Sequence, residues 1–227
     1  MNGFVQNAEQ FAAKFGVSRE TEGRLETYAE TLLQWQRAIN LVAPSTLPQL
    51  WHRHFADSAQ LIAHAPKKDC MHWVDLGSGA GFPGLVVAII AADRQAGGKV
   101  ASARFTLIES DNKKCAFMRE VLRKTGLGNF VTVDILCERI EYGANTSKLG
   151  TVDVISARAL TALERLLDLS APIFGSDTIA LFLKGREAEL EAEKAKGRWD
   201  FNFDLLPSIT EANAAVVMVR SLRSKKL

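Results

Sequence analysis

Apolar residues in the first part of the chain recur at the spacing of amphipathic helices. Between residues 18 and 40 they lie on one helical face, at Leu25, Tyr28, Ala29, Leu32, Leu33 and Ile39. Ser18 fits the N-cap of this helix, and Pro44 and Ser45 interrupt the pattern. A second stripe consists of Leu50, Trp51, Phe55, Ala59 and Ile62. It ends at Pro66, and we predict no strand before residue 70, so residues 1–66 form an N-terminal helical extension.

From residue 71 onward, short apolar runs alternate with helical stretches. Strands are predicted over residues 71–76, 104–109, 130–134, 152–157 and 178–183, with a helix after most of them. This alternation is typical of parallel βαβ units in a doubly wound sheet. Two further strand-like runs, residues 199–206 and 214–220, flank a loop containing Pro207 and are predicted to pair antiparallel. We therefore expect an α/β domain over residues 67–227.

Composition and charge narrow the functional class. Of the 227 residues, 47% are hydrophobic and 24% are charged, which is ordinary for a globular protein and argues against disorder or a fibrous repeat. Lys and Arg total 28 against 26 Asp and Glu, so a nucleic-acid site would have to come from local patches. The 3 cysteines have no C-x-x-C spacing and predict neither a disulfide framework nor a metal site. No secretion signal or bilayer-spanning run is visible, and we expect a cytoplasmic protein.

The most informative stretch follows the first predicted strand and has the sequence V-D-L-G-S-G-A-G-F-P-G over residues 74–84. In an open α/β sheet, ligands bind at the carboxyl ends of the strands, where the first strand-to-helix turn commonly forms the floor. Glycines let the backbone come close to a ligand, and the free N–H groups of a helix start can hold an anion. Pro83 suits the first helical turn, because its missing N–H is not needed there.

Two ligand classes fit this loop. From Gly79, the letters G-A-G-F-P-G satisfy the dinucleotide fingerprint, and Glu109 at the end of the next strand could hold a ribose. From Asp75, the same stretch reads acid-x-G-x-G-x-G and resembles motif I of the S-adenosylmethionine-dependent methyltransferases with a Rossmann-like fold. The helical leader favours the second interpretation, because a dinucleotide fingerprint commonly begins near the chain start. A turn that only packs a helix on a strand remains the structural alternative, and Glu109 could be only an N-cap.

An ordered series of motifs extends this resemblance over nearly the whole chain. The series comprises Asn40-Leu41, R-H-F-A-D-S at 53–58, the stretch 75–84, Glu109-Ser110 with Lys113, Lys114 and Phe117, Arg139-Ile140-Glu141, Ser156-Ala157-Arg158-Ala159, and Lys184-Gly185. With it, the chain resembles the glucose-inhibited division protein B family, bacterial methyltransferases that act on guanine N7 of small-subunit ribosomal RNA. The match is weakest at residues 208–214, where family members usually carry a basic stretch with an Arg-His pair.

The resemblance implies a cofactor, partners and site residues. The cofactor is S-adenosyl-L-methionine, and the partner is 16S rRNA, the small ribosomal subunit or its precursor. Because nothing in the sequence requires a dimer or a membrane, we expect a monomer without membrane attachment. Together with the loop chemistry, it gives the expected cofactor contacts Asp75, Gly77, Ser78, Gly79, Phe82, Glu109, Ile140, Glu141 and Arg158. Arg158 could hold the cofactor carboxylate or an RNA phosphate, and a surface ion pair is the structural alternative.

RNA binding is expected from local basic residues. The candidate contacts are Arg53, His54, Lys113, Lys114, Arg158 and Lys184, each of which could instead be ordinary solvated charge. His54 and Asp57 lie three residues apart and could form a structural pair that braces the leader against the sheet. No residue is assigned a catalytic role, because guanine N7 already carries a free lone pair and needs no general base.

Other functions stay open on the sequence alone. A methyltransferase for a small-molecule acceptor is the main alternative and differs in not requiring RNA. A nicotinamide-dependent oxidoreductase would differ in its cofactor, and a non-enzymatic RNA-binding module would bind RNA with the glycine loop blocked. The fourth predicted strand runs into I-S-A-R-A at residues 155–159, not the Asn/Asp-Pro-Pro-aromatic sequence of many exocyclic-amine methyltransferases.

Overall fold

The computed structural model describes residues 3–66, 68, 70–96, 102–142 and 149–225. Its first part is helical, as predicted, with α1 (Ala8–Phe15) and α2 (Arg19–Trp35). Ser18 is the N-cap of α2, because its side chain accepts a hydrogen bond from the N–H of Thr21. Gly16, with φ of 63°, ends α1 in the left-handed conformation that glycine adopts most readily.

The second predicted helical stripe, from Leu50 to Ile62, forms three short helical segments in place of one regular helix. They are the π-helix η2 (Trp51–Ala56), α3 (Asp57–Ala59) and the 3₁₀ helix η3 (Gln60–His64), and the 3₁₀ helix η1 (Pro44–Gln49) precedes them. The Trp51 and Phe55 rings stack with their centroids 4.5 Å apart, so the apolar stripe does face the core. The same segment contacts distant parts of the chain, because the Arg53 carbonyl accepts a hydrogen bond from Arg158 and Asp57 accepts one from Thr210.

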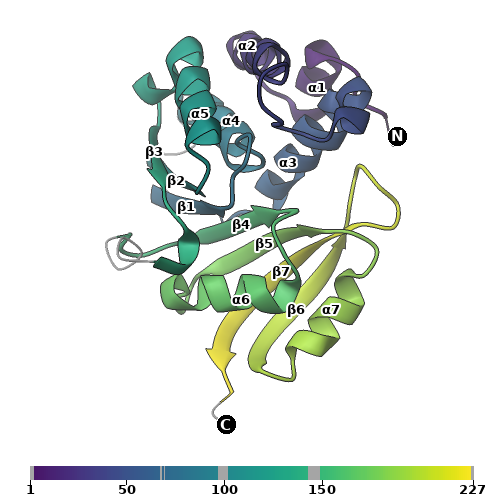
Figure 1. The fold of residues 1–227 in the computed structure, drawn as a ribbon, viewed down its shortest axis with the longest axis vertical. Helices are drawn as coiled ribbons and strands as arrows, with labels where there is room; N and C mark the ends of the chain where they lie inside the picture. Colours follow the sequence, from purple (N-terminus) through teal and green to yellow (C-terminus); the bar gives the residue numbers. More distant parts are fainter. Residues whose placement is uncertain (1–2, 67, 69, 97–101, 143–148, 226–227) are drawn as a thin grey trace.

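A seven-stranded sheet forms the centre of the molecule. The strands are β1 (Cys70–Leu76), β2 (Ser102–Glu109), β3 (Thr132–Cys137), β4 (Val154–Arg158), β5 (Ile179–Lys184), β6 (Trp199–Pro207) and β7 (Ala215–Ser224). Their order is β3-β2-β1-β4-β5-β7-β6 (Figure 1). The first five strands are parallel, while β7 runs antiparallel to both β5 and β6. The predicted doubly wound sheet with an antiparallel C-terminal pair is confirmed.

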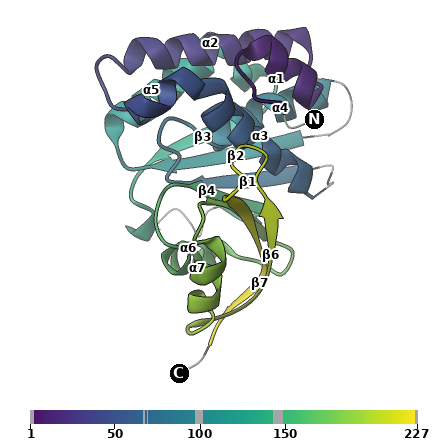
Figure 2. The same cartoon turned by 90° about the vertical axis from the view of Figure 1, so that its right-hand side faces the viewer.

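Helices cover both faces of this sheet (Figure 2). The helices that follow strands are α4 (Gly84–Ala96), α5 (Asn112–Thr125), α6 (Leu163–Ser170) and α7 (Ala188–Ala195), with short 3₁₀ turns η4 (Leu127–Asn129), η5 (Ile140–Tyr142) and η7 (Ala171–Ile173). One core packs the N-terminal helices, α4 and α5 against residues such as Trp73 and Phe105. The other packs α6 and α7 against Val74, Ile155 and Phe182. Successive strand residues therefore point to opposite cores, as the pleat requires.

The N-terminal helices share a core with the sheet and contact the loop after β1. Tyr28 and Phe82 stack with ring centroids 5.3 Å apart, and the Tyr28 hydroxyl donates a hydrogen bond to the Ala80 carbonyl. Phe55 meets Phe82 edge to face at 5.3 Å. None of the helices within the described ranges has the length and apolar character needed to cross a bilayer.

Candidate functional site

Two adjoining cavities open at the carboxyl ends of the parallel strands, where an open α/β sheet binds its ligands. The larger has a volume of about 940 Å³ and is walled by the loop after β1, the N-terminal helices, the segment after β5 and the β6–β7 loop. The smaller, of about 250 Å³, lies beside η5. Glu109 and Leu160 line both cavities, so these side chains stand at the boundary between them. Together the two are large enough for a ligand of nucleoside size.

The loop after β1 brings main-chain groups to the larger cavity. Gly77, Ser78 and Gly79, three of the residues expected to contact the cofactor, all line this cavity. Gly77 has φ of 65°, and a Cβ there would lie 2.5 Å from the Cδ1 atom of Leu160, so only glycine fits this turn. The predicted contact Phe82 also lines the cavity.

Asp75 lies beneath this loop and not in the cavity wall. Its carboxylate is fully buried, accepting hydrogen bonds from Ser156 Oγ at 2.6 Å and from the Gly84 N–H at 3.2 Å. Burial raises the pKa of Asp75 to about 6. The Asp75 oxygens bond to the start of α4 and to strand β4, so Asp75 holds the loop in place from beneath. In this position its carboxylate does not reach the cavity, where direct contact with the cofactor was expected.

Glu109 connects the end of β2 to the glycine loop. One carboxylate oxygen accepts a hydrogen bond from the Gly79 N–H and the other from the Asp111 N–H, each at 2.8 Å. The N-cap of α5 is Asp111, whose carboxylate accepts hydrogen bonds from the Lys113 and Lys114 N–H groups. The alternative that Glu109 only caps this helix is therefore wrong.

Ile140 and Glu141 line the smaller cavity on its η5 side. The Glu141 carboxylate lies 3.0 Å from the Arg165 guanidinium. A hydrogen bond from its own backbone and the bond from Arg165 lower the pKa of Glu141. Since the carboxylate is engaged by Arg165, a ligand in this cavity would meet the main chain of Ile140 and Glu141.

Arg158, at the end of β4, is held by the N-terminal helices. Its Nη1 donates a hydrogen bond to the Arg53 carbonyl at 2.8 Å and lies 3.5 Å from an Asp57 carboxylate oxygen, while Nη2 contacts His54 Nδ1. The guanidinium carbon also lies 5.3 Å from the centre of the Phe82 ring. The Arg158 side chain is only 16% exposed, so the surface ion pair considered for it is wrong.

His54 and Asp57 do not pair with each other, which corrects the pairing expected from their spacing. Each contacts Arg158, and the leader is braced against the sheet through this third residue. His54 Nδ1 faces the guanidinium and must be unprotonated, so Nε2 carries the hydrogen and donates it to Thr46 Oγ1 at 2.7 Å. Burial, reinforced by the charges of Arg158 and Arg53, lowers the pKa of His54 to about 3.

The β6–β7 loop, which departs from the family pattern in sequence, docks on the same helical segment. Thr210 Oγ1 donates a hydrogen bond to Asp57 at 2.6 Å, and the Thr210 carbonyl lies 3.1 Å from His52 Nε2. Glu211 forms an ion pair with Arg53 at 2.8 Å. The loop thereby closes one wall of the larger cavity, a role that its local sequence did not predict.

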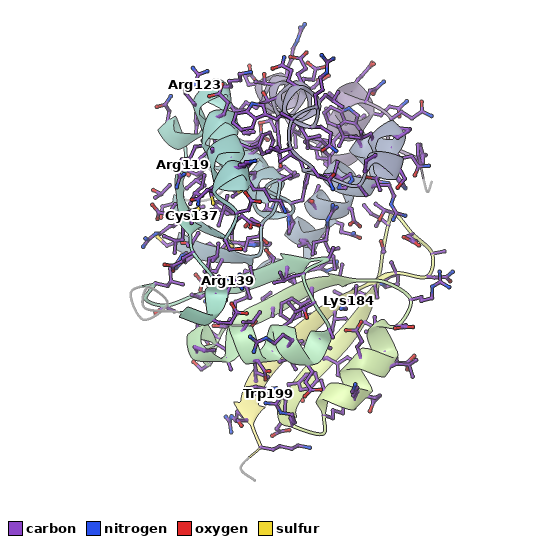
Figure 3. The ribbon with its side chains drawn as sticks, viewed as in Figure 1. Arg119, Arg123, Cys137, Arg139, Lys184 and Trp199 are labelled. Carbon is purple, nitrogen blue, oxygen red and sulfur yellow. The ribbon has the colours of Figure 1, made fainter. Side chains whose placement is uncertain are left out.

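The candidate RNA contacts differ in their surroundings. Five of the six line the larger cavity, namely Arg53, His54, Lys114, Arg158 and Lys184. Lys113 does not line it. Lys184, at the end of β5 (Figure 3), donates a hydrogen bond to the Thr161 carbonyl at 3.0 Å and pairs with Glu191 at 2.7 Å. Arg186 also lines the cavity and was missed, because it belongs to no recognisable motif.

The described residues contain no group of three or more His, Cys, Asp or Glu side chains arranged to hold a metal ion. Cys115 and Cys137 lie outside the walls of both cavities. Burial raises the pKa of the Cys115 thiol to about 12, so this thiol is protonated and unreactive.

Comparison with known proteins gives concordant results. Residues 21–216 match the GidB family, described as rRNA small subunit methyltransferase G. A ribosomal RNA small subunit methyltransferase G from Parvibaculum lavamentivorans is 44% identical over 218 residues, covering 96% of this chain and 91% of that protein. The enzyme of the same name from Methylobacterium nodulans is 43% identical over 218 residues, covering 96% and 97%.

Solved structures with little sequence identity share the fold. A SAM-dependent methyltransferase from Aquifex aeolicus has a TM-score of 0.54 and 15% identity, with coverage of 77% of this chain and 94% of that one. A methyltransferase from Geobacter sulfurreducens has a TM-score of 0.53 and 14% identity, with coverage of 96% and 98%. The sheet and its helices therefore have the arrangement of class I methyltransferases.

Proposed function

Because the chain belongs to the rRNA small subunit methyltransferase G family, we propose that it methylates guanine N7 in the 16S RNA of the small ribosomal subunit. The methyl donor is S-adenosyl-L-methionine, which supplies an electrophilic methyl group on its sulfonium when bound. The observation that carries the proposal is the pair of adjoining cavities at the glycine loop, with Glu109 at their boundary. One cavity suits the nucleoside part of the donor, and the other has room for the methionine part and an incoming base.

The donor residues follow from these positions. Glu109 would accept hydrogen bonds from the ribose hydroxyls, since its carboxylate stands between the cavities. The main chain of Ile140 and Glu141 would hold the adenine edge, and the N–H groups of the glycine loop would face the methionine carboxylate. Asp75 would act indirectly, by fixing the loop through the Gly84 N–H.

Methylation of guanine N7 requires that the base be positioned against the methyl group, and it does not require that a proton be removed from the base first. Guanine N7 has an in-plane lone pair that can attack a methyl group directly. His54 is neutral but both its ring nitrogens are engaged, and the Asp57 carboxylate is occupied by Arg158 and Thr210. These groups would keep the wall rigid while N7 aligns with the methyl group in a cavity that excludes bulk water.

We also propose the oligomeric state of the enzyme and the form of its RNA substrate. A base inside a folded RNA must leave its stack before it can enter a cavity of this kind. We expect a monomer acting in the cytoplasm on the small subunit or its precursor, with naked 16S RNA as the simplest substrate to test. A small-molecule acceptor remains the second candidate, because the larger cavity of about 940 Å³ would also admit one.

Transfer of a labelled methyl group tests the proposal. RNA from a strain lacking this protein should accept label from S-adenosylmethionine, and nucleoside digestion should recover it as 7-methylguanosine. RNA from the intact strain should accept little, because its site is already methylated. Label in another nucleoside, or none in RNA or assembled subunits, would contradict the proposed function and favour a small-molecule acceptor.

A further inference from the structure

Cationic side chains around the larger cavity fall into two groups. The five lysines and arginines in its wall are Arg53, Lys114, Arg158, Lys184 and Arg186. Three of them pair with carboxylates, at 2.8 Å for Arg53 with Glu211, 3.5 Å for Arg158 with Asp57 and 2.7 Å for Lys184 with Glu191. Their charge is largely compensated inside the protein, so they contribute little net attraction for an external anion.

Lys114 and Arg186 form the second group. Within the part of the chain that the structure describes, neither side chain makes an ion pair or hydrogen bond. Lys114 is the third residue of α5, whereas Arg186 lies in the segment between β5 and α7, where it is exposed. Glu187, the next residue, also lines the cavity and forms no ion pair with either cation within the described ranges. Two cations without an ion-pair partner among the described residues therefore stand at the cavity that would receive the RNA base.

Their separation follows from the order of the strands. Lys114 belongs to the helix that follows β2, and Arg186 follows β5, with β1 and β4 between these two strands in the sheet. Three inter-strand steps correspond to roughly 14 Å at the usual strand spacing. Long side chains that start near strand ends this far apart can reach two different phosphates, one on each side of a nucleotide whose base enters the cavity.

We propose that Lys114 and Arg186 bind the RNA phosphates on the two sides of the target guanine. Arg186 can grip a phosphate with paired N–H donors, whereas Lys114 acts as a point charge. Arg53, Arg158 and Lys184 maintain the cavity walls through their carboxylate partners. This inference rests on the proposed function. It separates cations that bind RNA phosphates from cations that hold the cavity walls, whereas the sequence alone gave basic residues of both kinds as candidate RNA contacts.

Salt dependence of RNA binding tests the two contacts. The variants are Lys114→Ala and Arg186→Ala, and the matched control is Lys113→Ala, which removes the neighbouring charge outside the cavity wall. Each phosphate contact that is lost should reduce the slope of log K against log salt by about 0.7 to 0.9. At low salt, each variant should bind small-subunit RNA several-fold more weakly, and the double variant should lose both increments. Lys113→Ala should keep the wild-type slope.

A second control separates phosphate binding from wall structure. Lys184→Met removes a cation whose charge Glu191 already compensates, so it should lower the Tm while leaving the salt slope unchanged. Binding of S-adenosylmethionine by Lys114→Ala and Arg186→Ala should match wild type, which shows that the cofactor site is intact. An unchanged slope in both variants, or an equal change in Lys113→Ala, would overturn the proposal. Wild-type protein that neither binds nor methylates the RNA or the subunit would overturn the proposed function itself.

Discussion

Gly84 lies where the glycine loop joins α4 and has no space for a side chain. A Cβ atom there would lie 2.2 Å from Leu107 Cδ2 and 2.9 Å from Asp75 Cβ. We expect Gly84→Ala to lower the free energy of unfolding by about 1–3 kcal/mol, because the first turn of α4 must move away from β1. The same movement breaks the Gly84 hydrogen bond to Asp75, so binding of S-adenosylmethionine should weaken as well. Denaturant titration and calorimetry would measure the two effects.

Gly23, the fifth residue of α2, provides the matched control. A Cβ atom at this position would meet nothing within 4 Å. Gly23→Ala should therefore be neutral or stabilising by up to about 1 kcal/mol, through its helix propensity alone. An equal loss of stability in the two alanine variants would contradict the close packing at Gly84.

Because His54 is neutral in the native protein, the free energy of unfolding should depend on pH, and the direction of the change can be predicted. Its pKa falls from 6.5 to about 3 on folding, so the unfolded chain binds a proton in this window that the native protein does not. The contribution of His54 to stability is therefore complete above the unfolded pKa and is lost as the pH falls through the window. The side-chain oxygen of Asn can replace His54 Nδ1 as the acceptor for Arg158, but Asn has no group that titrates. We expect His54→Asn to gain roughly 1–2 kcal/mol relative to wild type between about pH 7 and about pH 5.

Urea titrations of both proteins at several pH values would measure this difference. His54→Leu should lose stability at every pH, since it leaves Nη2 of the buried Arg158 guanidinium without its acceptor. A stability difference between His54→Asn and wild type that does not change with pH would show that His54 titrates normally.

The sequence located the residues of the glycine loop well but could not assign every role. Glu109 was placed correctly at the end of its strand, because strand ends and glycine motifs are local features. The contacts of Arg158 with His54 and Asp57 span about a hundred positions in the chain, and no local pattern contains them. The ion pair of Arg53 with Glu211 spans 158 positions and was invisible for the same reason. Lys184 and Glu191 are close in the chain, but their ion pair joins the end of β5 to α7 across a loop, and no helical or strand periodicity predicts it.

At the scale of elements, apolar periodicity predicted where helices and strands lie but not their details. Strand β3 begins at Thr132 and extends to Cys137, later than the predicted residues 130–134, because the turn η4 occupies Leu127–Asn129. The stripe from Leu50 to Ile62 predicted a helical segment, yet its π and 3₁₀ turns accompany contacts with Arg158 and the β6–β7 loop. Such contacts depend on tertiary packing and leave no periodic signal.

The docking of the β6–β7 loop on this segment can be tested through one hydroxyl group. Thr210→Val keeps the shape of the side chain and removes the hydrogen bond to the largely buried Asp57 carboxylate, whose side chain is 17% exposed. We expect a loss of about 1–3 kcal/mol in the free energy of unfolding, because a buried acceptor loses a donor. Thr132→Val, at the exposed start of β3, should change stability by less than about 0.5 kcal/mol. Equal effects in the two variants would contradict the role of the loop as a fixed wall.

At the scale of the whole molecule, the N-terminal helices and the sheet share one core. Phe11, Leu25 and Tyr28 belong to the same apolar cluster as Trp73 and Phe105. We therefore expect residues 1–66 and 67–227 to unfold together, although the helical leader and the α/β part differ in pattern. Coincident transitions in far-UV circular dichroism and tryptophan fluorescence would support this, since tryptophans occur in both parts. Two separate transitions, or a stable fragment lacking the leader, would contradict it.

The overall architecture was predictable because repeated local patterns of apolar residues determine it. Alternating strands and helices indicated the parallel sheet, and the last two strand-like runs indicated the antiparallel pair. The cavity was less predictable, since its walls come from six separate parts of the chain. The sequence named the loop and Glu109, but the opposite wall formed by the β6–β7 loop emerges only from the packed structure.

We propose that this cleft methylates guanine N7 of small-subunit RNA and that Glu109 holds the donor. Borohydride and aniline cleave RNA at 7-methylguanosine, so primer extension on 16S RNA would locate the modified base in cells. We expect cleavage at one guanine in a deletion strain complemented with wild-type protein, none in the deletion strain, and strongly reduced cleavage with Glu109→Ala. Cleavage that persists in the deletion strain, or that does not return with the wild-type protein, would contradict the claim.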